Sequence, residues 1–130
     1  MSNKHKKIIH IFGNILLPFD SLPLKLQPEL QAALPEIDFV ISDPNENIKP
    51  VNKELVIIDT VLDIDEIKII KNIDQIQDNQ TYSMHDFDLG LNLKLLQKIG
   101  ELEKITIFGV PPDMDKKNAL EQLIKLIKEI

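Results

Sequence analysis

The sequence predicts an α/β protein, a three-layer α/β/α sandwich built on a mostly parallel or mixed five-stranded sheet. Five short apolar runs rich in β-branched residues are separated by helical patterns or long connections, an order typical of parallel sheets. The runs lack strict alternation of apolar and polar residues, which is expected of strands covered on both faces. Glycine, proline or Asp-Pro pairs end several of the runs.

The first part of the chain supplies two strands and a helix. Lys7–Phe12 is a β-branched run that stops at a glycine, and it predicts the first strand. Leu24–Leu34 has helical apolar spacing, but Pro28 lies inside it. Because an internal proline removes a hydrogen bond, this helix is either kinked or begins near Gln27. Ile37–Ile41 predicts the second strand.

The rest of the chain supplies three strands and two helices. The polar segment Asp43–Asn52 is interpreted as a loop because it contains two prolines. The remaining strands are predicted at Leu55–Ile58, Ile67–Lys71 and Ile105–Val110. A helix within residues 81–100 is indicated by leucines at helical spacing, with a glycine just past its end. Asn118–Ile130 predicts a final amphipathic helix.

Length and charge limit the class of protein. The chain has 130 residues, so we expect a single domain, 1–130. Its formal net charge is −6 and its pI is near 5.0, which argues against a nucleic acid or an acidic membrane as partner. The first apolar run is too short to cross a bilayer, and we expect neither a leader nor an anchor. Oligomeric state is left open.

Cysteine is absent from the sequence. This excludes disulfides, thiolate zinc sites, iron–sulfur clusters and a cysteine nucleophile. The absence is compatible with a cytoplasmic protein, and we expect that location.

Three ionisable residues fall at the carboxyl ends of predicted strands, where ligands bind in such sheets. Asp20 lies in the connection after the first strand, Asp59 follows the third, and His85 follows the fourth. Two carboxylates and an imidazole form a ligand set suited to nickel, zinc or manganese rather than calcium or magnesium. The alternative is that such acids only cap helices and form turns.

Other chemical motifs are weaker. The sequence lacks GxGxxG and GxxxxGK[ST], so dinucleotide and P-loop fingerprints are absent. Ser21 and Ser83 lack a nucleophile elbow, which argues against a serine hydrolase. His10 lies within a predicted strand and is interpreted as a sheet histidine with a hydrogen-bond partner.

Four segments together resemble a known family. GNILLPFD resembles the GNxLxxDD or GNxLxxDE segment of the hydrogenase maturation proteases, and LVIIDTV is similar to their apolar strand that ends in aspartate. SMHDFDLGL is similar to their S-x-H-x-x-x-L helix start, and ITIFGVPP to their closing strand. The four segments occur in the family's order and span most of the chain.

The resemblance implies an endopeptidase that removes a C-terminal extension from a nickel-loaded [NiFe]-hydrogenase large-subunit precursor by metal-assisted hydrolysis. It places the metal-ligating and catalytic roles on Asp20, Asp59 and His85, with Asn14 shaping the loop beneath them. The nickel is expected to arrive with the substrate, so no permanent cofactor is implied. Zinc or another divalent metal could replace it, since the same ligands accept either.

The sequence also departs from the family pattern. Phe19 stands where the family has the first acid of its pair, and SDPNENIKPVNKE replaces a DGGT-like loop. These departures motivate a second hypothesis, a noncatalytic metal- or peptide-binding module derived from the same fold. A third is a structural α/β domain with incidental acids at its strand ends.

Overall fold

A five-stranded sheet with strand order β2-β1-β3-β5-β4 organises the protein. The computed structural model describes residues 7–42, 48–72 and 93–130. The strands are β1 (Lys7–Ile11), β2 (Ile37–Ile41), β3 (Glu54–Thr60), β4 (Lys68–Ile70) and β5 (Lys104–Val110). β1, β2, β3 and β5 are parallel, and β4 pairs with β5 in the opposite direction. The predicted fold class, a mostly parallel sheet with mixed direction allowed, is confirmed.

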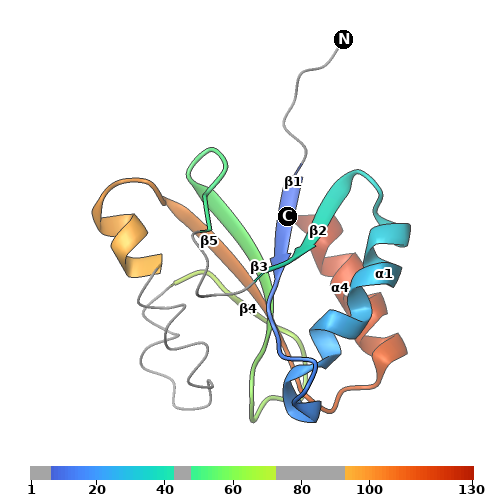
Figure 1. Ribbon diagram of the computed structural model, residues 1–130. Coiled ribbons are helices and arrows are strands. Elements are labelled where there is room, and N and C mark those ends of the chain that lie inside the picture. Colours follow the sequence, from blue (N-terminus) through green and yellow to red (C-terminus); the bar gives the residue numbers. More distant parts are fainter. Residues whose placement is uncertain (1–6, 43–47, 73–92) are drawn as a thin grey trace.

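Helices cover both faces of the sheet (Figure 1). α1 (Leu22–Ala33) follows β1, and α4 (Lys116–Glu129) follows β5. They lie together on one face. On the other face, residues 93–98 are helical and are the described end of the helix predicted within residues 81–100.

Two apolar cores follow from the alternation of side chains along the strands. Between the sheet and the α1–α4 layer, Ile9, Ile58 and Phe108 are fully buried. On the opposite face, Phe12 and Ile57 pack in a second core together with Leu93. This explains why the strands read as continuous apolar runs, because both of their faces are buried.

Several boundaries differ from the predictions by one or more residues, and two of them bear on the site. β3 continues to Thr60, because it pairs with β5 from Glu54 to Thr60, and Asp59 therefore lies inside the strand. α1 begins at Leu22, and the alternative start near Gln27 is wrong. A proline in the first turn of α1 lacks only an N–H that the turn does not need, and Pro28 remains inside the helix.

The outer edge of β2 is closed by side chains from α1. Gln31 Nε2 donates to Ile37 O at 2.6 Å, and Phe39 N donates to Gln31 Oε1 at 3.0 Å. Gln27 Nε2 donates to Phe39 O at 2.9 Å. These bonds occupy backbone groups that an exposed edge strand leaves available for pairing with another chain.

His85 lies outside the described residues, as do most of the predicted helix within 81–100 and the first part of the loop Asp43–Asn52. The described end of that loop contains a bridge between Val51 and Glu54. Within the described ranges, no helix is long and apolar enough to cross a membrane.

Candidate functional site at the carboxyl edge of the sheet

Asp59 is a buried carboxylate near the end of the central strand β3. Its side chain is 2% exposed, and by alternation it lies on the same face as Ile57, the face of the second core. Its Oδ1 atom accepts a hydrogen bond of 2.8 Å from the backbone N–H of Thr60. Burying a carboxylate is costly without a hydrogen-bond partner, and the N–H of Thr60 supplies such a partner for the carboxylate of Asp59.

The bond to Thr60 N–H has a topological cause. β1 pairs with β3 only as far as Ile11, opposite Ile58, and the last bond between them runs from Phe12 N to Ile58 O. In a parallel strand, every second residue directs its N–H to the same side. Thr60 therefore directs its N–H toward β1 just where β1 has ended, and the Asp59 carboxylate accepts this hydrogen.

Asp20 is the second buried carboxylate, in the connection between β1 and α1. It ends the short 3₁₀-helix η1 (Pro18–Asp20) and is 6% exposed. The cap position of α1 is Ser21, whose side chain makes no capping bond and whose Oγ donates instead to Pro18 O at 3.2 Å. The N-cap residue of α1 is therefore Ser21, the residue after Asp20.

Asp20 is held against the end of β1 by its backbone. Its carbonyl oxygen accepts a 2.9 Å bond from Asn14 N. A Cβ added to Gly13 would lie 2.6 Å from that same oxygen, closer than a side chain tolerates. Glycine is required here because the connection folds back directly onto it.

Asn14 organises the turn between β1 and η1. Its Oδ1 accepts from Leu16 N at 2.9 Å, and its backbone oxygen accepts from Leu17 N at 3.0 Å. Asparagine forms such local turns readily because its side chain can replace a backbone acceptor. The role expected for Asn14, shaping the loop beneath the site, is supported by these contacts.

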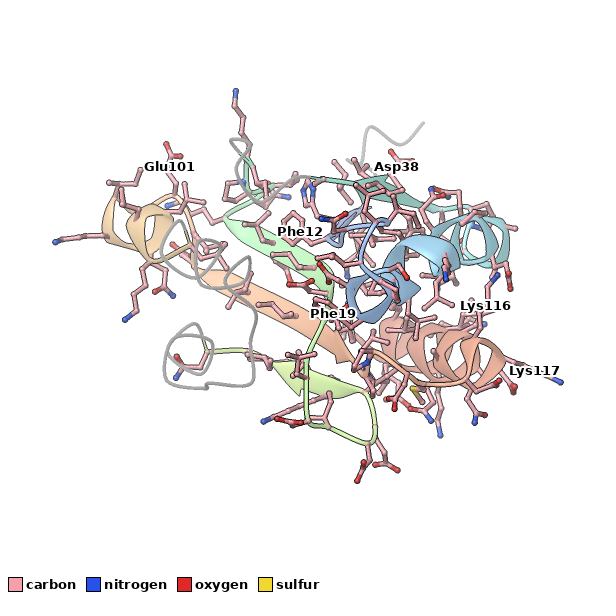
Figure 2. All side chains as sticks on the ribbon, turned by 60° about the horizontal axis from the view of Figure 1, so that its bottom comes forward. Phe12, Phe19, Asp38, Glu101, Lys116 and Lys117 are labelled. Atoms are coloured by element: carbon pink, nitrogen blue, oxygen red, sulfur yellow. The ribbon has the colours of Figure 1, made fainter. Side chains whose placement is uncertain are left out.

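The two carboxylates belong to one edge of the sheet. The strand register places Phe12 and Gly13 beside Asp59 and Thr60, while Asp20 lies against Gly13. Figure 2 views the molecule from this edge, with Phe12 and Phe19 labelled near its middle. Sequence reasoning therefore brought Asp20 and Asp59 to one edge correctly, although the third predicted residue, His85, lies outside the described residues.

One buried polar atom near the site has no hydrogen-bond partner. In the described part of the chain, Thr60 Oγ1 is buried without a donor or acceptor. An unsatisfied buried hydroxyl costs about 1–3 kcal/mol. It follows Asp59 directly and, by alternation, lies on the opposite face, toward α1 and α4.

The side chains around Asp20 include apolar groups that the sequence did not mark as exposed. Ile15, Leu16 and Phe19 are 60%, 83% and 48% exposed. The available signal was their position between the glycine that ends the first predicted strand and the predicted start of the helix at Leu24.

His10 has the sheet role that its position predicted. Its Nδ1 lies 2.8 Å from Ser42 Oγ, across the β1–β2 pair. Burial lowers the pKa of His10 from its ordinary value, because desolvation disfavours the charged imidazolium. It takes no part in a cluster of metal-binding side chains among the described residues.

The donor set of this edge fits a divalent transition metal only when a third ligand joins it. Within the described ranges, no three of the histidine, cysteine, aspartate and glutamate side chains gather into a metal-binding group. Asp20 and Asp59 are two buried carboxylates, and they would need an imidazole to complete a ligand set that nickel or zinc accepts. The described site is thus a pair of carboxylates at the carboxyl edge of a mostly parallel α/β sheet, the place where this class of protein binds ligands.

Comparison with solved structures identifies the particular α/β fold. The chain resembles the hydrogenase maturating endopeptidase HybD from E. coli, with a TM-score of 0.66, 18% identity and coverage of 95% of this chain and 93% of that one. A hydrogenase 3 maturation protease gives a TM-score of 0.63 at 22% identity, covering 92% and 87%. The endopeptidase HycI from Escherichia coli gives 0.61 at 20% identity, covering 95% and 90%.

These similarities establish a shared fold over nearly the whole chain. No family model matches the sequence, and no curated protein matches it. The fold that the sequence resemblance implied, that of the hydrogenase maturation endopeptidases, is the fold that the chain has.

Proposed function

We propose that this protein is a maturation endopeptidase that removes a C-terminal extension from a nickel-loaded hydrogenase large-subunit precursor. The observation that carries the proposal is the pair of buried carboxylates, Asp20 and Asp59, at the carboxyl edge of the sheet. Two further points support it. The fold is shared with maturation endopeptidases, and the segment around His85 resembles the family segment that carries the third metal ligand.

In this proposal the nickel belongs to the substrate, and Asp20, Asp59 and His85 bind it. When bound, a divalent ion supplies Lewis-acid polarisation of the scissile carbonyl. The chain fixes the ligands: Thr60 N–H orients the Asp59 carboxylate, and the Asn14 turn holds Asp20. Because both carboxylates are buried, their attraction for the metal is screened less than it would be at an exposed site.

The test is cleavage of a purified, nickel-loaded [NiFe]-hydrogenase large-subunit precursor, followed by mass spectrometry of its C-terminus. We expect the wild-type protein to shorten the precursor, and the variants Asp20→Asn, Asp59→Asn and His85→Ala to lose this activity. Glu101→Gln is the matched control, because Glu101 is an exposed carboxylate in the connection before β5, away from the carboxyl edge. Undiminished cleavage by the Asp20 and Asp59 variants would contradict the assignment of the site.

A second function is favoured by one specific observation. Phe19, at the position of a family acid, places an apolar ring at the surface directly before Asp20. A protein that binds the precursor without cutting it needs contact area more than an additional acid. Binding of the precursor with an unchanged C-terminus would identify this noncatalytic module.

A further inference from the structure

The connection between β1 and α1 exposes a cluster of large apolar side chains. Ile15, Leu16, Leu17 and Phe19 are 60%, 83%, 38% and 48% exposed, and we call these four residues the apolar tip. Single exposed apolar residues are ordinary, but here four of five consecutive residues are large, apolar and exposed. Such surfaces mark sites of interaction with other molecules.

The apolar tip is presented by a hydrogen-bonded turn. Asn14 accepts bonds from Leu16 N and Leu17 N, and Asp20 N donates to Leu17 O at 2.9 Å. Pro18 restricts the backbone further, because its ring fixes φ. A surface held in this way loses little conformational entropy when a partner binds.

The connections around the apolar tip are acidic. Three of the connections that leave the carboxyl edge, residues 12–21, 61–67 and 111–115, contain carboxylates but neither lysine nor arginine. These carboxylates are Asp20, Asp63, Asp65, Glu66, Asp113 and Asp115. The described lysines that follow these connections are Lys25, one turn into α1, Lys68, which starts β4, and Lys116, which starts α4 and pairs with Glu29 at 2.7 Å. Figure 2 shows Lys116 on the α4 side of the view, away from Phe19.

This charge selects among the possible occupants of the surface. A second copy of the chain docked by the same edge would bring two sets of carboxylates together, and like charges across an interface are unfavourable. An anionic lipid surface is repelled for the same reason. A polypeptide with apolar side chains beside lysine or arginine satisfies both features of the edge, because its charge is complementary.

We propose that the apolar tip and the acidic connections beside it form a docking surface for a protein segment in which apolar residues are flanked by lysine or arginine. The tip immediately precedes Asp20, so a segment bound there lies next to this buried carboxylate and at the same edge of the sheet as Asp59. The inference rests on the proposed function only for the identity of the natural partner. That partner is the precursor, and this surface would hold the segment of it that is cleaved.

The first test uses synthetic peptides and does not depend on cleavage. A short leucine–lysine peptide is titrated into the full-length protein by calorimetry, beside leucine–glutamate and serine–lysine peptides of equal length. We expect the wild type to bind the leucine–lysine peptide, and the double variant Ile15→Ser/Leu16→Ser to bind it about tenfold more weakly, equivalent to about 1.4 kcal/mol. The leucine–glutamate and serine–lysine peptides should bind more weakly than the leucine–lysine peptide.

A matched control separates the apolar tip from general surface hydrophobicity. Leu95 and Ile99 are 57% and 64% exposed, close to the exposure of Ile15, but belong to the segment at the far side of the sheet (Figure 1). Leu95→Ser/Ile99→Ser should leave peptide affinity unchanged. Thermal unfolding of both double variants checks that neither has lost its fold.

Several outcomes would overturn the docking proposal. Equal affinity of wild type and the Ile15→Ser/Leu16→Ser variant would remove the apolar tip from the interface, and equal binding of the serine–lysine peptide would reduce the effect to charge alone. Tip-dependent self-association in sedimentation would assign the surface to a second copy, and tip-dependent binding to phosphatidylserine vesicles would assign it to lipid. Tip-dependent peptide binding without precursor cleavage would instead count against the proposed function alone.

Discussion

Two strand–connection–helix units, β1 to α1 and β5 to α4, cover the same face of the sheet in different ways. Each leaves its strand at the carboxyl edge and returns as a helix, and the two helices share one apolar core. The connection after β5 is short and polar, and Asp115 caps α4 by accepting from Asn118 N at 3.1 Å. The connection after β1 exposes Leu16 and buries Asp20.

The β1 connection and the start of α1 have features that do not favour stability, whereas the β5 connection and the start of α4 do favour it. α4 is fixed at its first turn by a side-chain cap, whereas α1 has no capping side-chain bond and contains an internal proline. α1 is instead fixed further along, where Gln27 and Gln31 bond to the edge of β2. Burying a carboxylate and exposing apolar residues are both unfavourable for an isolated fold, so the β1 connection has the features of a binding region.

The largest effect is expected from Gly13→Ala in the β1 connection. The new methyl group would collide with the backbone oxygen of Asp20, which cannot move without breaking its bond to Asn14. We expect a loss of about 3 kcal/mol in the free energy of unfolding, measured by urea denaturation. Gly100→Ala is the control, because nothing lies within 4 Å of its added Cβ and only its φ of 81° is strained, which costs about 1 kcal/mol. Equal losses would show that the close approach at Gly13 relaxes freely.

A smaller effect is expected from Gln31→Ala in α1. The variant loses two hydrogen bonds to β2, one to Ile37 O and one from Phe39 N, which corresponds to about 2 kcal/mol. Gln27→Ala loses a single bond to Phe39 O, or about 1 kcal/mol. Chemical denaturation of both variants would measure the difference. If Gln31→Ala cost no more than Gln27→Ala, α1 would not depend on these edge bonds for its position.

The helix caps give the next comparison. Asp115→Ala should destabilise the protein by about 1 kcal/mol, because it removes the side-chain cap of α4. Ser21→Ala at the corresponding position of α1 removes only the bond from its Oγ to Pro18 O, and we expect about 0.5 kcal/mol. Thermal unfolding of the two variants in parallel checks the order. The reverse order would mean that Ser21 stabilises α1 in a way that its geometry does not show.

The last difference between the units depends on pH. β1 contains His10, whose pKa is lowered by burial, whereas β5 contains no histidine. As the pH is lowered, the unfolded chain therefore binds a proton at His10 at a higher pH than the folded protein does. The stability contributed by the neutral imidazole is present above the ordinary histidine pKa of about 6.5 and falls as the pH decreases below it. His10→Asn should reduce the loss of stability between neutral and mildly acidic pH, measured by denaturation at several pH values. A pH dependence identical to wild type would show that His10 titrates alike in both states.

The sequence predicted much of the secondary structure and the fold class. The β-branched runs, their glycine and proline ends, and their lack of alternation predicted the five strands and the sheet buried on both faces. Two of the three candidate site residues, Asp20 and Asp59, were brought to one edge by the rule that parallel strands end together. His85 stays a prediction, because it lies outside the described residues.

The local sequence by itself determined where strands and turns form, since these depend on side-chain shape and backbone preference along a few residues. Only the tertiary structure decided that Asp59 accepts the N–H of Thr60, because this depends on where β1 stops beside β3. It also decided that Leu16 is exposed while Ile11 is buried. Both residues are apolar, and the difference comes from which neighbours the folded chain places against them.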